Sequence, residues 1–213
     1  MEILPGVLAY NQDDFRKHLL HHDLRAVASM FHVDVLDNSL FPFKSWADPS
    51  VIGRWKNLPE IELHCMVARP VQLVEAWQTN VPTLKRVIVH FEIGRSLSKV
   101  ITQLRAFKLE ILVAVNPSTP IDEPAQLSVD GLLIMGVEPG RSGQKFLGEP
   151  MLAKMRRAKA LFPDLSLALD GGLSEANIKD ISRAGVSHCV ASSALWKSAY
   201  PAEAYINLHN KIS

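Results

Sequence analysis

Imidazole and carboxylate side chains stand inside apolar stretches at several points of this chain. His32 and Asp34 are two residues apart in the run Met-Phe-His-Val-Asp-Val-Leu-Asp. Because residues two apart on a β-strand point to the same face, we expect these two side chains to emerge next to each other. His64 lies in a second apolar run, Ile-Glu-Leu-His-Cys-Met-Val, and Asp170 ends a third, Leu-Ala-Leu-Asp. Three expected strand ends thus supply two imidazoles and two carboxylates.

This combination of side chains suits a divalent metal ion and carbon-acid chemistry. Neutral imidazole and carboxylate are ligands for zinc, iron(II), cobalt or manganese, and the lack of thiolates argues against a closed structural zinc site. Asp34 and Asp170 are expected to face each other, so that one removes a proton from a carbon and the other returns one from the opposite side, as an epimerase requires. A nearby dication would stabilise the enediolate and make the C–H bond more acidic. The alternative is that each polar residue is a separate group satisfied by hydrogen bonds.

A fourth run repeats the same-face spacing with His90 and Glu92. These residues either orient a metal ligand from behind or form a histidine pair satisfied within the fold. The sequence leaves both interpretations open.

Short apolar runs alternate along the chain with longer amphipathic stretches. The expected strands are Ile3–Ala9, Ala26–Leu36, Glu60–Val67, Arg86–Phe91, Glu110–Val115, Gly131–Met135, Ser166–Leu169 and Ser187–Ala191. The expected helices are Gln12–His22, Pro49–Lys56, Pro70–Gln78, Ser96–Phe107, Pro124–Leu127, Pro150–Leu161, Ser174–Ala184 and Pro201–Ile212.

Eight strand–helix alternations predict an α/β fold, a (β/α)8 TIM barrel of the phosphate-binding type, rather than an open doubly wound sheet. Residues 1–213 are expected to form one domain, because neither a linker nor a low-complexity segment interrupts the pattern. The polar residues support the barrel, since they fall at the C-terminal strand ends, where barrel enzymes place their sites.

Three loops rich in glycine or serine follow the last three expected strands. Residues 136–144 read Gly-Val-Glu-Pro-Gly-Arg-Ser-Gly-Gln, and two shorter loops follow strands seven and eight. Loops at these positions commonly bind phosphate in barrels, and glycines let the backbone approach an anion closely. The predicted phosphate-binding residues are Gly140, Arg141, Ser142, Gly143, Gly171, Gly172, Ser192 and Ser193.

Composition limits the partners and the compartment. The chain has 213 residues, of which 47% are hydrophobic and 21% charged, with a net charge of +1. These values predict a globular protein and give no reason to expect nucleic acid as a partner. Cys65 and Cys189 stand far apart inside apolar runs, which indicates buried thiols. With neither a signal peptide nor a run of about 20 apolar residues in view, we expect a cytoplasmic protein without membrane contact.

Together these segments resemble the ribulose-phosphate 3-epimerase family, metal-dependent enzymes of pentose-phosphate and carbohydrate metabolism with a (β/α)8 barrel. The matching segments follow the family's order over nearly the whole chain: residues 32–37, 41–42, 64–67, 90–92, 116–120, 137–140, 143–146, 170–172 and 191–194. The resemblance implies that His32, Asp34, His64 and Asp170 bind one divalent metal ion. We expect this ion to be zinc, with iron(II), cobalt or manganese as alternatives. It also implies that Met66 and Met135 line the pocket near the enediolate, and that the chain forms a homo-oligomer.

The chain departs from the family in residues that face the substrate. The usual Pro-Ser at the end of the first strand is Pro5-Gly6, so a serine hydroxyl that reaches the substrate is missing there. Phe43 replaces an asparagine, and the final Gly-Ser is Ser192-Ser193. The expected reaction is therefore epimerisation at C3 of a ketose phosphate, with D-ribulose 5-phosphate and D-xylulose 5-phosphate as the first pair. The alternatives are a six-carbon ketose phosphate, a sugar-phosphate aldolase or synthase, or a paralogue that binds a sugar phosphate without turnover.

Overall fold

Eight parallel strands close into a barrel in chain order in the computed structural model, which describes residues 1–124 and 127–212. The strands are β1 (Glu2–Val7), β2 (Met30–Leu36), β3 (Glu60–Met66), β4 (Leu84–His90), β5 (Glu110–Val115), β6 (Gly131–Met135), β7 (Ser166–Asp170) and β8 (His188–Ala191). The ring closes because β1 pairs with β8 as well as with β2. The predicted (β/α)8 barrel is confirmed.

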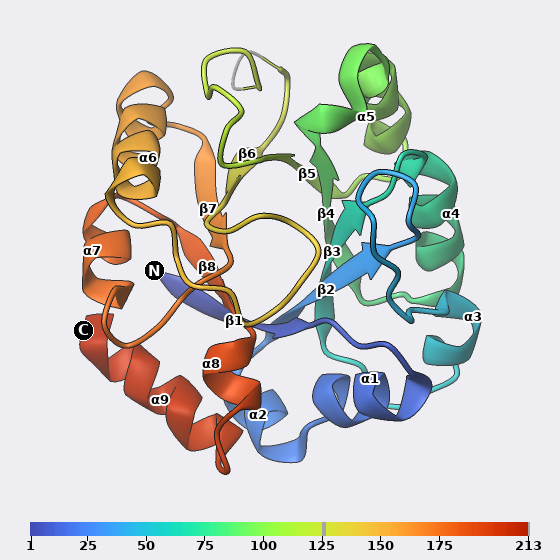
Figure 1. Cartoon of the computed structure of the whole chain (residues 1–213). Coiled ribbons are helices and arrows are strands. Elements are labelled where there is room, and N and C mark those ends of the chain that lie inside the picture. Colours follow the sequence, from blue (N-terminus) through green and yellow to red (C-terminus); the bar gives the residue numbers. More distant parts are fainter. Residues whose placement is uncertain (125–126, 213) are drawn as a thin grey trace.

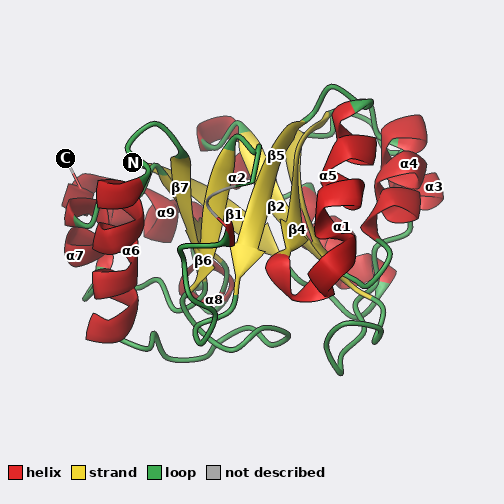
Figure 2. Ribbon diagram, turned by 90° about the horizontal axis from the view of Figure 1, so that it is seen from above, coloured by secondary structure: helices red, strands yellow, loops and turns green. Residues whose placement is uncertain are grey.

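Helices surround the barrel on its outer side, as Figures 1 and 2 show. They are α1 (Gln12–Leu19), α2 (His22–Val27), α3 (Pro49–Ile52), α4 (Pro70–Asn80), the 3-10 helix η1 (Phe91–Ser96), α5 (Leu97–Arg105), α6 (Glu149–Leu161), α7 (Ile178–Arg183), α8 (Ser193–Trp196) and α9 (Pro201–Ile212). In the described part of the chain, none of these helices is long and apolar enough to cross a membrane.

The expected strands agree with the observed ones to within a few residues, except at the start of β2. The expected strand Ala26–Leu36 is wrong in its first residues, because Ala26 and Val27 end helix α2. The expected helix Gln12–His22 is correspondingly two helices. His21 caps the start of α2, and its ring nitrogen accepts a bond from the Leu24 backbone N–H at 3.4 Å. Histidine is not among the strongly preferred capping residues, so the sequence carries no clear signal of this start.

Two other expected helices have clearly different boundaries, and a third cannot be compared. The helix expected from Ser174 begins only at Ile178, because the Asn177 amide oxygen accepts from the Ser174 backbone N–H at 2.9 Å and holds a turn before the helix. The expected helix Pro49–Lys56 is helical only to Ile52. The expected helix Pro124–Leu127 includes residues 125 and 126, which lie outside the described residues.

Alternation along the strands divides the core into two layers. Phe31, Val33 and Val35 of β2 belong to the apolar layer between barrel and helices. The residues between them, His32 and Asp34, are buried inside the ring instead. A smaller apolar cluster fills another part of the barrel interior: Leu36, Met66, Ile88, Leu112, Ala114, Leu133, Met135 and Ala168. Both free cysteines are buried, as expected.

Candidate active site

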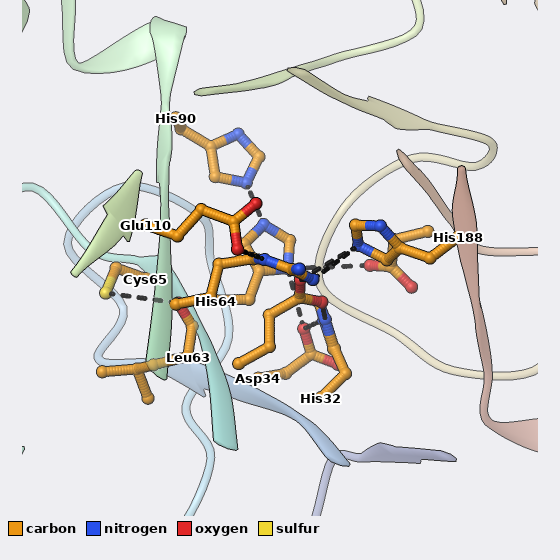
Figure 3. Close-up of polar contacts among 11 residues, drawn as sticks. His32, Asp34, Leu63, His64, Cys65, His90, Glu110 and His188 are labelled. Carbon is orange, nitrogen blue, oxygen red and sulfur yellow. Dashed lines mark hydrogen bonds and ion pairs between the residues drawn. The ribbon is translucent and has the colours of Figure 1, made fainter. Parts of the chain in front are cut away.

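Four side chains converge near the C-terminal ends of β2, β3 and β7. One ligand atom from each of His32, Asp34, His64 and Asp170 lies within 4.8 Å of the others, and all four residues are buried. Asp34 Oδ1 lies 3.1 Å from His32 Nε2 and 2.9 Å from His64 Nδ1. Asp170 Oδ2 lies 3.7 Å from the same His64 nitrogen. We call these four residues the donor set; Figure 3 shows its two histidines on either side of Asp34.

Strand register explains why residues so far apart in sequence meet. His32 and Asp34 point inward from one strand, and Asp34 is the direct neighbour of His64 across the β2–β3 ladder. Asp170 is the last residue of β7, at the same end of the barrel. The four predicted metal ligands are therefore brought together at one place.

The two carboxylates of the donor set differ in acidity. Burial raises the pKa of Asp34, but the His32 and His64 imidazoles outweigh it and hold this pKa below its usual value. Burial, and then the Asp34 charge, raise the pKa of Asp170 to about 6. Burial lowers the pKa of His32, yet Asp34 and Glu62 together raise it well above its ordinary value. Two buried carboxylates thus share one site and favour a positive charge between them.

A buried ion network that the sequence analysis missed lies behind His32. Glu62 accepts a bond from His32 Nδ1 at 2.6 Å. Its other oxygen lies 2.7 Å from Arg86 Nη1 and 3.0 Å from His188 Nε2. Arg86 also pairs with Glu110 at 2.8 Å, and Figure 3 labels this second partner. In the neutral form of His32, a proton held on Nδ1 leaves the Nε2 lone pair facing Asp34.

His90 and Glu92 form a second chain of contacts, behind His64. His90 Nε2 lies 2.9 Å from His64 Nε2, and the two rings are stacked. His90 Nδ1 contacts a Glu92 carboxylate oxygen at 3.0 Å. Burial lowers the pKa of His90 to about 4, so this ring is neutral at pH 7. A neutral His90 bonded to Glu92 through Nδ1–H accepts the His64 Nε2–H, which leaves the His64 Nδ1 lone pair facing the donor set.

The donor set fits a divalent metal ion by its chemistry. Imidazole nitrogens and carboxylate oxygens are common metal ligands, and partners behind both histidines hold each ring in a defined orientation. When both imidazoles are neutral and present lone pairs to Asp34, nitrogen and oxygen acceptors face each other about 3 Å apart. Only a proton or a cation between them relieves that repulsion.

A cavity opens next to Asp34 and Asp170 and encloses about 490 Å³ of space, part of it open to solvent. Figure 1 shows the loop after β6, coloured yellow, running across this end of the barrel. The predicted binding residues that line the cavity are Met66, Met135, Gly140, Arg141, Ser142, Gly143, Gly171, Gly172, Ser192 and Ser193. His32, His64, His90 and Glu92 are not among the lining residues described.

Two glycines in these loops are required by their conformation. Gly143 and Gly172 have φ values of 83° and 77°, a region that other residues rarely adopt. A Cβ on Gly172 would also lie 2.6 Å from the Phe146 backbone, so the two loops approach closely there. Glycine at both positions therefore sets the shape of the loops that line the cavity.

Lys197 is a further charged residue at these loops that the sequence analysis did not identify. Its Nζ lies 3.2 Å from the position a Gly143 Cβ would take. Lys197 directly follows the short helix α8, which was not expected from the sequence. Arg141, by contrast, directs its guanidinium over the Phe43 ring at 5.4 Å. The loops after β2 and β6 thus meet beside the cavity.

The fold and the site define an α/β-barrel enzyme whose cavity ends on a buried set of metal-type ligands. Comparison with known proteins gives the family. The sequence profile of the Ribulose-phosphate 3 epimerase family matches residues 2–196. The chain belongs to this family of epimerases, which are isomerases.

Curated relatives carry the same assignment. The chain is 29% identical over 224 residues to the cytoplasmic isoform of ribulose-phosphate 3-epimerase from Oryza sativa subsp. japonica, covering 99% of this chain and 94% of that protein. It is 28% identical over 193 residues to the ribulose-phosphate 3-epimerase of Eremothecium gossypii, covering 84% and 80%. Among solved structures, a 3-hexulose-6-phosphate synthase superposes with a TM-score of 0.73 at 15% identity, with both chains covered completely. This last likeness concerns the fold.

Proposed function

We propose that this protein catalyses metal-dependent epimerisation at C3 of a ketose phosphate, with D-ribulose 5-phosphate and D-xylulose 5-phosphate as the first candidates. The observation that supports it most directly is the joint position of Asp34 and Asp170. Both carboxylates line the cavity, and both belong to the donor set. The relatives named ribulose-phosphate 3-epimerase support the choice of the five-carbon substrate.

The two carboxylates exchange protons with C3 from opposite faces. One carboxylate removes the C3 proton, and the electron pair of that bond moves toward the C2 carbonyl oxygen to give an enediolate. The other carboxyl group donates a proton to the opposite face of C3, and the configuration inverts. In the reverse reaction Asp34 and Asp170 exchange these roles. A divalent ion held by the donor set supplies positive charge that stabilises the enediolate.

The other residues of the cavity place the substrate for this exchange. The backbone of the loops at Gly143, Gly171 and Gly172 suits the phosphate, and Lys197 lies next to Gly143 with a positive charge. Met66 and Met135 line the cavity with apolar atoms, which keeps water away from the reacting carbon. His90 and Glu92 act through His64 by fixing its ring.

Deuterium exchange at C3 tests the proposal. The metal-loaded protein is incubated with D-ribulose 5-phosphate in D2O, and both deuterium at C3 and D-xylulose 5-phosphate are followed by NMR, with and without a chelator. We expect exchange with product formation, loss on chelation, and recovery with Zn²⁺, Fe²⁺, Co²⁺ or Mn²⁺. Absence of exchange from folded, metal-loaded protein removes the pentulose assignment, and six-carbon ketose phosphates are tried next.

Substitutions separate the mechanism from the substrate. Asp34→Asn and Asp170→Asn should each abolish turnover while the fold remains, as judged by circular dichroism. Asp37→Asn is the matched control, because this exposed carboxylate follows β2 directly but does not line the cavity. Full activity in both active-site variants would contradict the two-carboxylate mechanism.

A further inference from the structure

The end of β1 and the end of β8 meet at one point of the cavity wall. Pro5 pairs with Ala191 in the parallel ladder, so the next residues, Gly6 and Ser192, lie side by side. On its other side Gly6 is in register with His32 of the donor set. This point therefore lies between the donor set and the loop that follows β8.

The absence of a side chain at Gly6 leaves room for the side chain of Ser192. A Cβ at this position would overlap Ser192 Oγ and would come within 2.7 Å of Val190 Cγ1. The Gly6 backbone is not among the positive-φ residues, so its conformation does not by itself require glycine. The neighbouring serine requires it instead, because the Ser192 hydroxyl already fills the space above β1.

A half-buried indole stabilises this arrangement. Trp196 Nε1 donates a hydrogen bond to the Gly6 carbonyl oxygen at 2.5 Å. Trp196 belongs to α8, which begins directly after Ser192. The ring of His18 stacks on the indole at a centroid distance of 4.1 Å. The hydrogen bond from Trp196 and the stacking of His18 on its ring thus hold the end of β1 next to the segment that begins at Ser192.

The Ser192 hydroxyl has no hydrogen-bond partner among residues 1–124 and 127–212, and it belongs to the cavity wall. We propose that Ser192 Oγ binds a hydroxyl of the substrate's carbon chain. Gly6 and Ser192 then act as a pair, in which the protein's hydroxyl group comes from the end of β8 instead of the end of β1. The proposal rests on the proposed function, since it takes a ketose phosphate as the ligand. It makes Ser192 a residue that reads the sugar and not the phosphate.

The neighbouring serine has the complementary position. Ser193 Cβ lies 4.0 Å from the place of a Gly143 Cβ, on the side of Lys197 and the phosphate loops. Ser192, by contrast, stands over Gly6 in register with the donor set. The two adjacent serines therefore face different parts of one elongated ligand.

Binding of two probes tests the division between these serines. D-ribitol 5-phosphate keeps the hydroxyls and the phosphate but has no carbonyl, so it cannot be epimerised; inorganic phosphate has only the anion. Calorimetry on the metal-loaded protein should show that Ser192→Gly weakens ribitol 5-phosphate about tenfold, the worth of one hydrogen bond, and leaves inorganic phosphate within about twofold. Ser193→Ala is the matched control and should weaken both probes by the same factor.

The reciprocal variant tests the pair itself. Gly6→Ser alone should lower the melting temperature by several degrees, because its Cβ overlaps Ser192 Oγ. The double variant Gly6→Ser with Ser192→Gly should regain the melting temperature, and it should bind ribitol 5-phosphate within about threefold of the unchanged protein.

Each result bears on the inference. Unchanged binding of ribitol 5-phosphate by Ser192→Gly overturns it, and so does an equal loss for both probes. Additive melting-temperature losses in the double variant overturn the pairing. If the unchanged protein binds ribitol 5-phosphate and Ser192→Gly weakens it, but no ketose phosphate is epimerised, then the proposed function fails and the Ser192 contact stands.

Discussion

Glu62 is the residue whose removal should reveal most about how this barrel tolerates charge in its interior. Its side chain is fully buried and accepts from three donors, His32, Arg86 and His188. Glu62→Gln keeps the shape, and its amide oxygen still accepts from His32. The amide nitrogen then faces two donors, so the bonds to Arg86 and His188 are lost.

The expected loss follows from those two bonds. Hydrogen bonds to a charged group contribute about 1.5–3 kcal/mol each, and breaking a buried ion pair by removing one partner costs about 3–5 kcal/mol. We therefore expect Glu62→Gln to lower the free energy of unfolding by about 3–5 kcal/mol in urea denaturation. It should also weaken metal binding about 10–100-fold, because His32 loses its charged partner.

Glu110→Gln provides the control, because Glu110 pairs with the same Arg86 but is 37% exposed. Exposed ion pairs contribute about 0–1 kcal/mol, so this variant should lose less than about 1 kcal/mol. Equal losses in the two variants, or a loss below about 1 kcal/mol for Glu62→Gln, would refute the view that burial makes this network stabilising.

Three further outcomes are expected. Lys197→Met should raise the KM for the ketose phosphate about tenfold with kcat within about threefold, since its ammonium lies beside Gly143; unchanged steady-state kinetics would contradict this. The pKa of Glu92 is about 2, because bonds from His90, Thr119 and the Asn116 backbone outweigh its burial. Its ionised form therefore stabilises the fold above about pH 4.5, and this stability is lost as the pH falls toward 2. In urea titrations Glu92→Gln should be about 1–2 kcal/mol less stable at pH 7, and this difference should disappear in that acid range. In a thermal-shift assay a chelator should lower the melting temperature and added Zn²⁺ should raise it. At a Zn²⁺ concentration of 100 times the Kd, the free energy of unfolding should increase by about 2.7 kcal/mol. Asp170→Asn should show no such response.

The sequence predicted those parts of the site that follow from local rules. The two-residue spacing placed His32 and Asp34 on one face, and strand alternation confirmed it. The same rule also applies to Glu62, which stands two residues before His64, so this network partner was open to prediction. No local pattern connects Arg86 with His188, since 102 positions separate them and only barrel closure brings them together.

Other features depended on tertiary contacts. The start of α2 uses a histidine ring as its cap, which composition does not signal. Lys197 follows a helix of four residues, too short to appear as a periodic pattern. The relation between Gly6 and Ser192 is visible only when β1 and β8 are adjacent. These contacts form only when the barrel is folded, so a local sequence pattern does not predict them.

The distribution of charge inside the barrel supports the proposal that the donor set binds a cation. Arg86 neutralises Glu62, and Glu92 is bound by His90 and by donors near the end of β5. Asp34 and Asp170 have no lysine or arginine partner among the described residues, only the two imidazoles. The apolar cluster fills another part of the barrel interior and strengthens electrostatic interactions across the site. Two carboxylates without a lysine or arginine partner, beside two oriented histidines, therefore support the proposal that the donor set binds a cation.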